Sequence, residues 1–333
     1  MPEIDLSAST TLDPWTQLWG QTVRSSWDLL GDNPVALALR EHWQDQSAWI
    51  SARSSVVDVG SGPAVLARLL QAHMRATSPD GEIRQPSWTC VDQARIPASS
   101  LSDLKRVEGK FGLPWEAVPP PATGAGALVS SFGLEYVDRD RIVANCASWL
   151  AGGGRLHAVL HARDSVIDQQ SALGLADLEL IFDDLDFPGR VAALLEAKVT
   201  APADPMARMM HGIEVRDAFN ECVNRMKSQL EVRGAREGAL LEWLMCARDL
   251  VQSVTEATLE TALERLQAQR TAYEAERARL TAMRSCALDQ PGLEALGRDL
   301  ASKGFESIQM GSLQASVGPV AWVVDALRAQ GSH

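Results

Sequence analysis

The spacing of hydrophobic residues changes sharply within Ser55–Leu70. A short run of β-branched residues ends at Val59 and is typical of a strand buried on both faces of a parallel sheet. The turn Gly60-Ser61-Gly62 follows, and apolar residues then recur at helical spacing from Val65 onward. The pattern predicts a strand, a glycine turn and a helix, the unit whose carboxyl edge binds ligands in open α/β sheets.

Strand-like and helix-like segments continue to alternate as far as His161. This alternation is typical of a parallel sheet with crossover helices. Helices are predicted near 99–110 and through Ile142 to Leu150, the second stopped by Gly152-Gly153-Gly154. The strands predicted after the first are 88–92, 113–118, 127–131 and 155–161.

The N-terminal residues 1–54 are rich in tryptophan and are predicted to be helical, with a helix start at Asp13-Pro14. Trp15, Trp19 and Trp27 fall near one face of the helical turns that follow. Two interpretations stay open for such rings. They either anchor the layer against the sheet or form an aromatic wall over the ligand site.

The middle of the chain, residues 163–290, carries helical spacing and no convincing strand. Apolar residues form one seam over Thr255–Met283, and a helix of that length would span about 43 Å. The helix is predicted to be half of a helical hairpin or an element of a homodimer. Because this segment leaves the fifth strand at the carboxyl edge of the sheet, it is also expected to cover the substrate pocket.

Composition narrows the class of partner. The net charge of −12 argues against a nonspecific grip on nucleic acid or on anionic membrane surfaces. The five cysteines are scattered without a CxxC pair, which favours reduced thiols and no metal site. No apolar run approaches the about 18 residues of a membrane span, so the sequence predicts a cytoplasmic protein.

The glycine turn does not fit a nicotinamide dinucleotide site. Such a fingerprint needs a third glycine where this chain has Val65, and an acidic residue about 20 positions on, whereas Asp92 lies further away. The combination Asp58-x-Gly60-x-Gly62, with a second strand ending in Asp92, instead resembles the first two motifs of class I S-adenosylmethionine-dependent methyltransferases.

Three later segments resemble the same family, in its small-molecule type. Ser130–Val137 is similar to its fourth motif, and Leu150–Leu156 is similar to the turn into its fifth strand. Leu300–Glu306 resembles the step into the sixth strand, near 307–313, and 319–327 resembles the antiparallel seventh strand.

The resemblance implies an α/β fold: a Rossmann-like, seven-stranded, mostly parallel sheet with an N-terminal helical layer and a large helical insertion between the fifth and sixth strands. The expected organisation has three parts. They are the tryptophan-rich layer 1–54, the methyltransferase core 55–162 and 291–333, and the helical insertion 163–290, acting as substrate lid, dimerisation element or both.

By the same resemblance, S-adenosyl-L-methionine is the expected cofactor. Gly60 and Gly62 would let its methionine part approach closely, Asp58 would help place its amino group, and Asp92 would accept both ribose hydroxyls. The full set of expected cofactor-binding residues is Asp58, Gly60, Gly62, Asp92, Gln93, Ser130 and Ser131. Whether Glu116-Ala117 supplies the adenine contact stays open.

Two residues are candidates for acceptor activation. His161 falls at the carboxyl end of the fifth strand and could take a proton as the methyl group arrives, while Tyr136 could orient the acceptor. His157 lies on the same strand face, and a hydrogen-bonded core histidine is the favoured interpretation there. A carboxylate acceptor would need no base.

The sequence therefore predicts methyl transfer to an oxygen or nitrogen, including that of a carboxylate, of a small molecule, in a setting such as natural-product biosynthesis. Three alternatives stay open. They are a binding or assembly module without turnover, a peptide or protein acceptor, and a nicotinamide-dependent reductase, which Val65 disfavours.

Overall fold

The computed structural model describes residues 13–21, 33–77, 85–234 and 238–330. The chain divides into two compact units. The sheet unit comprises the described residues of Met1–Gln169 and Ala282–His333, and the helical unit comprises those of Gln170–Thr281. Trp27 lies outside the described residues.

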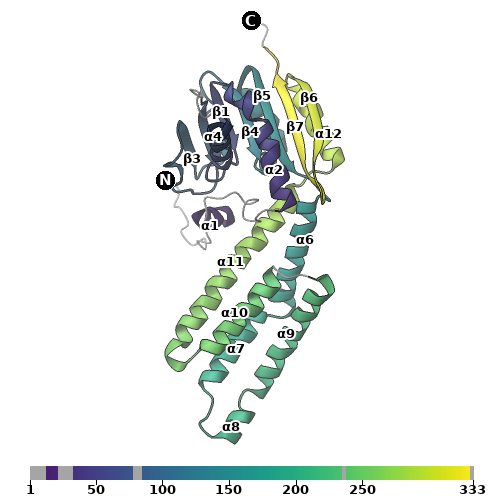
Figure 1. Ribbon diagram of the computed structural model, residues 1–333. Helices are drawn as coiled ribbons and strands as arrows, with labels where there is room; N and C mark the ends of the chain where they lie inside the picture. Colours follow the sequence, from purple (N-terminus) through teal and green to yellow (C-terminus); the bar gives the residue numbers. More distant parts are fainter. Residues whose placement is uncertain (1–12, 22–32, 78–84, 235–237, 331–333) are drawn as a thin grey trace, which may run out of the picture. The chain divides into compact units, whose positions relative to one another are not determined.

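The sheet unit contains a seven-stranded sheet in the order β3-β2-β1-β4-β5-β7-β6 (Figure 1). β1 to β5 run parallel, and β7 pairs antiparallel with both β5 and β6. This is the topology of the class I methyltransferases, so the expected fold is confirmed. The strands are β1 Ser55–Val59, β2 Ser87–Asp92, β3 Val107–Phe111, β4 Ala125–Ser131, β5 Leu150–His161, β6 Phe305–Ala315 and β7 Gly318–Arg328.

Both faces of the sheet are buried, because successive residues of a strand point to opposite faces. Val57 and Val59 of β1 belong to one hydrophobic cluster, together with residues of α5 (Arg139–Trp149) and α12 (Gln290–Ser302). Val56 belongs to a second cluster on the other face. That cluster includes residues of α2 (Pro34–Asp45), α3 (Ser47–Ser51) and α4 (Val65–Thr77).

The N-terminal segment forms α1 (Pro14–Gln21), α2 and α3 in its described part. The side chain of Asn33 caps α2 by accepting a 2.8 Å hydrogen bond from the Ala36 N–H. Leu39 and Trp43 of α2 are completely buried in the second cluster, so this helix is an integral part of one sheet face.

The predicted third strand was wrong. The strand is β3, Val107–Phe111, which overlaps the end of the predicted polar helix 99–110. In the predicted strand, Trp115–Ala117 form a 3-10 turn, η3. β3 is an edge strand whose residues are only partly buried, so its sequence lacks a hydrophobic run. The segment 113–118 that was predicted as a strand is apolar for another reason. Trp115 in it is buried against Trp149, with ring centroids 5.5 Å apart.

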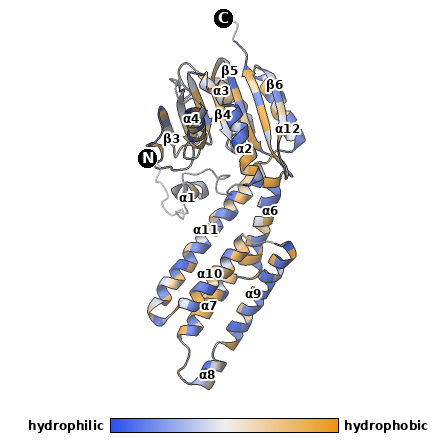
Figure 2. Ribbon diagram, in the orientation of Figure 1, coloured by the Kyte–Doolittle hydropathy of each residue, from blue (hydrophilic) through white to orange (hydrophobic). Residues whose placement is uncertain are grey.

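A large helical insertion separates β5 from β6, as expected. It contains α6 Val166–Glu179, the π-helical turn η5 Leu180–Asp184, α7 Phe187–Val199, α8 Pro205–Met210, α9 Ile213–Arg233, α10 Ala239–Ser253, the 3-10 turn η6 Glu256–Thr258 and α11 Leu259–Cys286. The helical unit takes most of these residues, from Gln170 to Thr281. Figure 2 shows that α9 is hydrophilic along much of its length.

The helical unit has its own hydrophobic core. Leu266 of α11 is buried in it, and Leu259, Leu263, Tyr273 and Leu280 pack against it partly buried. The apolar seam of the predicted long helix is therefore used inside the insertion. A homodimer through these helices stays a prediction. No helix in the described residues has the length and hydropathy needed to cross a membrane.

Candidate functional site

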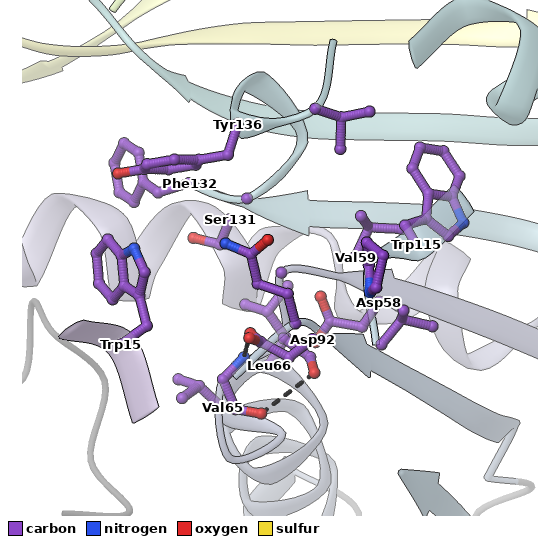
Figure 3. Close-up of a pocket in the computed structure, with 18 of the residues that line it drawn as sticks. Trp15, Asp58, Val59, Val65, Leu66, Asp92, Trp115, Ser131, Phe132 and Tyr136 are labelled. Carbon is purple, nitrogen blue, oxygen red and sulfur yellow. Dashed lines mark hydrogen bonds between the residues drawn. The ribbon is translucent and has the colours of Figure 1, made fainter. Parts of the chain in front are cut away.

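A cavity of about 200 Å³ lies in the sheet unit where β1, β2, β4 and β5 reach their carboxyl ends. Open α/β sheets bind their ligands at this edge, where strand ends and helix amino termini meet. Most residues expected at the site line this cavity: Asp58, Gly60, Gly62, Asp92, Gln93, Ser131, Tyr136 and His161. Figure 3 shows the residues that surround it.

The glycine turn after β1 is shaped for close approach. Gly60 and Gly62 have φ values of +68° and +51°, a region that favours glycine. A Cβ atom on Gly60 would meet the Cα of Gly133 at 2.4 Å, and one on Gly62 would come within 3.1 Å of the Trp19 ring. Glycine at position 60 therefore lets this turn pack closely against the loop after β4, and glycine at position 62 leaves room beside the Trp19 ring.

Asp58, the last residue but one of β1, is the least satisfied polar group of the cavity. Its side chain is fully buried, and neither carboxylate oxygen has a hydrogen-bond partner among the described residues. Burial, followed by the nearby Asp92 carboxylate, raises the pKa of Asp58 well above its usual range. Such a group is costly unless a ligand supplies a donor or a cation.

Asp92 at the end of β2 is held by backbone amides. Oδ2 accepts a 2.8 Å hydrogen bond from the Gly62 N–H, and Oδ1 accepts one of 2.8 Å from the Ala94 N–H (Figure 3 shows the first). Burial nevertheless raises its pKa to about 6. Each carboxylate oxygen keeps a second acceptor position. Asp92 thus braces the glycine turn and still offers two oxygens to a ligand.

The remaining expected cofactor residues differ in position. Gln93 is exposed at the rim of the cavity, and Ser131 lines it while its Oγ accepts a 3.3 Å hydrogen bond from the Trp43 indole. Ser130 lies outside the cavity lining. Its buried hydroxyl donates to the Val59 carbonyl at 2.7 Å and accepts from the Leu134 N–H at 2.9 Å, which ties β4 to β1.

The two expected catalytic residues lie together. The Tyr136 hydroxyl and Nε2 of His161 are 3.3 Å apart, and the Phe132 ring stacks on His161 with centroids 4.5 Å apart. Burial lowers the pKa of His161 to about 3 and raises the pKa of Tyr136 above its usual value. His161 is therefore a neutral imidazole at neutral pH, a good hydrogen-bond acceptor but a poor final holder of a proton.

His157 lies in the core, as favoured from the sequence. Its Nδ1 is 2.7 Å from Oδ2 of Asp325, and its Nε2 is 3.0 Å from Nε2 of His42. Arg155 also pairs with Asp325, at 2.8 Å. All polar atoms of the His157 ring therefore have partners away from the cavity.

The N-terminal tryptophans divide between the two interpretations. Trp15 and Trp19 of α1 line the cavity, with their ring centroids 6.1 Å apart, whereas Trp43 is a buried packing residue. Trp15 also meets the Tyr136 ring edge to face at 5.7 Å. α1 therefore supplies an aromatic wall to the cavity.

Several lining residues had no role predicted from the sequence. Phe132 has a left-handed backbone, with φ of +58°, which is strained for a residue with a side chain and turns the ring onto His161. Met283 near the end of α11 also lines the cavity, and no motif in the sequence pointed to it. Trp115 and Glu116 line it as well, so the Glu116-Ala117 segment does border the site.

Glu135 is a further titratable group beside the site. Its Oε1 accepts a 2.7 Å hydrogen bond from the His161 N–H, and its Oε2 is buried without a partner among the described residues. Burial raises the pKa of Glu135 to about 7. In the described part of the chain, no three His, Cys, Asp or Glu side chains gather as metal ligands would.

Comparison with known proteins finds similar folds among solved structures and no similar sequence. No protein-family profile and no curated protein matches this sequence. Solved structures do match. The carbon methyltransferase CurJ shares 10% identity over 91% of this chain and 57% of its own, with a TM-score of 0.44. The plantazolicin methyltransferase BpumL, in complex with a monoazolic desmethylPZN analog and SAH, shares 10% identity over 48% of this chain and 56% of its own, with a TM-score of 0.33.

A third match is geranyl diphosphate C-methyltransferase from Streptomyces coelicolor A3(2), in complex with Mg2+, geranyl diphosphate and S-adenosyl-L-homocysteine. It shares 18% identity over 38% of this chain and 46% of its own, with a TM-score of 0.30. This chain thus covers less than two thirds of each of these three proteins. Because the TM-scores are low, the class I methyltransferase fold is assigned from the strand order itself.

Proposed function

We propose that this protein binds S-adenosyl-L-methionine in the cavity at the carboxyl edge of the sheet and transfers its methyl group to an oxygen or nitrogen of a small molecule. When bound, this cofactor supplies a methyl group already activated on a sulfonium. The chain then has to orient the acceptor and exclude water.

The observation that carries the proposal is the pair of buried carboxylates beside the glycine turn. Asp58 has no partner on either oxygen among the residues that the structure describes, and Asp92 keeps free acceptor positions. A ligand with an ammonium group, a sulfonium and two ribose hydroxyls offers the positive charge and the donors that these groups lack. Asp58 suits the ammonium, and Asp92 suits the hydroxyls.

A nicotinamide dinucleotide fits this charge pattern poorly. Its pyrophosphate would have to lie against the glycine turn, beside the carboxylates of Asp58 and Asp92. Like charges in a desolvated site repel strongly. No Lys or Arg side chain of the described residues lines the cavity to offset that repulsion.

His161 and Tyr136 would orient the acceptor. A neutral imidazole at the end of β5 can accept a hydrogen bond from an acceptor O–H or N–H and so fix its lone pair toward the methyl group. Because burial holds the pKa of His161 at about 3, we infer that the proton passes on to solvent rather than remaining on this ring.

The expected partners remain part of the proposal. They are a small-molecule acceptor and, through the insertion, a second copy of the chain, with no nucleic acid and no membrane surface. The net charge of −12 supports the two exclusions. Use of the insertion as a substrate lid and a role in biosynthesis are likewise proposed.

The deciding experiment is calorimetric titration of S-adenosylmethionine, its demethylated product and NADPH into the protein. We expect micromolar binding of the first two, and none of NADPH. Asp58→Asn and Asp92→Asn should each weaken binding at least tenfold, because each removes a charge that faces the cavity. Asp45→Asn, an exposed carboxylate on α2, is the matched control and should bind normally.

Binding of NADPH without S-adenosylmethionine would overturn the proposal in favour of a reductase. Binding of neither would favour an assembly module that keeps the sheet without turnover. Circular dichroism of each variant separates lost binding from lost folding.

A further inference from the structure

The cavity has two chemically different ends. Among the described residues that line it, the carboxylates are those of Asp58, Asp92 and Glu116, and they accompany the glycine turn and Trp115. Figure 3 shows the rings of Trp15, Phe132 and Tyr136 together on the side away from Trp115. His161 stacks on Phe132, and Met283 also lines the cavity.

The aromatic end is built from rings that touch one another. Trp15 meets Tyr136 at a centroid distance of 5.7 Å, Tyr136 meets His161 at 6.0 Å, and Phe132 stacks on His161 at 4.5 Å. These residues come from three separate parts of the chain: α1, the loop after β4, and the end of β5. Because these rings also line the cavity, they offer aromatic surface to an occupant, and a planar ring can pack on such a surface without the entropy cost of a flexible ligand.

Charge restricts the occupant further. An anionic acceptor would leave water for a cavity whose described lining contains no Lys or Arg, and it would face the negative π surfaces and the carboxylates. A cationic acceptor would be repelled by a sulfonium in the same cavity, and a protonated amine has no lone pair to receive a methyl group.

The hydrogen-bonding groups of the aromatic end indicate which polar group the acceptor carries. At the aromatic end, Nε2 of His161 and the Tyr136 hydroxyl meet at 3.3 Å, a long contact that a ligand O–H could replace. Ser131 Oγ is already used by the Trp43 indole. One donor and one acceptor at the edge of a ring pocket match a single polar substituent on a flat apolar body.

We propose that the acceptor of this protein is an electroneutral, planar aromatic or heteroaromatic compound that presents one hydroxyl group to His161 and Tyr136. This inference rests on the proposed function. It excludes carboxylate, phosphate and diphosphate acceptors, and it narrows the oxygen and nitrogen acceptors expected from the sequence to uncharged ring hydroxyls.

The test uses two probe pairs that share a ring and differ in charge at neutral pH: phenol against benzoate, and 2-naphthol against 2-naphthoate. Each is titrated into the full-length protein saturated with S-adenosylhomocysteine. We expect the neutral member of at least one pair to bind at least tenfold more tightly than its anionic partner.

Substitutions locate the binding. Trp15→Leu and Tyr136→Leu should each weaken binding of the neutral probe at least fivefold, because each removes one ring of the aromatic end. Tyr136→Phe keeps the ring and should weaken binding of the neutral probe less than Tyr136→Leu does. Trp49→Leu removes an indole that does not line the cavity and serves as the matched control.

The outcomes separate the two proposals. Absence of S-adenosylhomocysteine binding to the wild-type protein would refute the proposed function, and this inference with it. Binding of that ligand together with equal or tighter binding of the anionic probes, or with no binding of either neutral probe, would overturn the inference and leave the proposed function intact.

Discussion

Glu135 should make the protein less stable as the pH rises. It lies in the 3-10 turn η4 (Leu134–Tyr136) after β4, where Oε1 accepts the His161 N–H and Oε2 is buried without a partner in the described residues. Burial of the negative charge outweighs the backbone hydrogen bonds that it receives, so the pKa of Glu135 rises from 4.5 to about 7.

Proton linkage determines the direction and the size of this change in the free energy of unfolding. At pH values well below 4.5 both the folded and the unfolded chain carry the proton on Glu135, and burial costs nothing through this group. Between 4.5 and about 7 the unfolded chain releases its proton first, so the free energy of unfolding falls as pH rises. Above that window the full cost applies, about 3 kcal/mol for the difference in pKa.

Glu135→Gln should remove this dependence, because an amide of the same shape can still accept the His161 N–H and never ionises. The stability difference between the variant and the wild type should therefore grow with pH. From about pH 5 to about pH 8.5 it should increase by about 2 to 3 kcal/mol in favour of the variant. Glu116→Gln, which alters an exposed carboxyl in the neighbouring 3-10 turn, should show a difference near zero at both pH values.

Urea unfolding followed by tryptophan fluorescence is the appropriate assay. Trp243 is the only tryptophan between residues 170 and 281, so the signal reports mainly the sheet unit that contains Glu135. A stability difference between Glu135→Gln and wild type that is the same at both pH values would refute the reasoning. So would a variant that is less stable at the higher pH.

Three further outcomes are expected in the same assay. Gly133→Ala should cost at least 2 kcal/mol, because its Cβ would lie 2.5 Å from the Cα of Gly60; a loss below about 0.5 kcal/mol would show that the two loops can separate. Asp325→Asn should cost about 1 to 3 kcal/mol at neutral pH. Burial raises the pKa of Asp325, but hydrogen bonds from His157 and Arg155 outweigh it and lower the pKa below 3.8, so this cost should shrink as pH falls below that value. Leu39→Ala should cost about 2 to 5 kcal/mol by leaving a cavity in the second cluster, and a near-neutral result would mean that α2 is not part of the stable sheet unit.

The central strands were predictable because their side chains are buried on both faces. β1, β2, β4 and β5 all cover the segments predicted for them, with bounds that differ by a few residues. Each is an inner strand of the sheet. Burial on both faces favours hydrophobic residues there, so the sequence pattern of these strands is easy to recognise. The edge strand β3 was missed because only its partly buried face constrains its sequence.

The closeness of the glycine turn to Asp92 was predictable from the sequence. Gly60, Gly62 and Asp92 are close in space because a glycine turn and the end of the next parallel strand meet at one sheet edge whatever the remaining sequence. Ser130 is expected at the cofactor from the sequence, and that stays a prediction. What the structure adds is that its hydroxyl ties β4 to β1, because the side-chain direction at the end of a strand depends on the local twist and on the following loop.

The sequence by itself thus determined four of the inner strands, the glycine turn and the acidic residues that accompany it, because these depend on short-range patterns and on general sheet geometry. Only the tertiary structure decided that Trp15 meets Tyr136, that His161 is too buried to hold a proton, and that Asp58 lacks a partner within the described ranges of the chain. Those properties arise from residues far apart in the chain and from the removal of water around them, and no local pattern of residues encodes either.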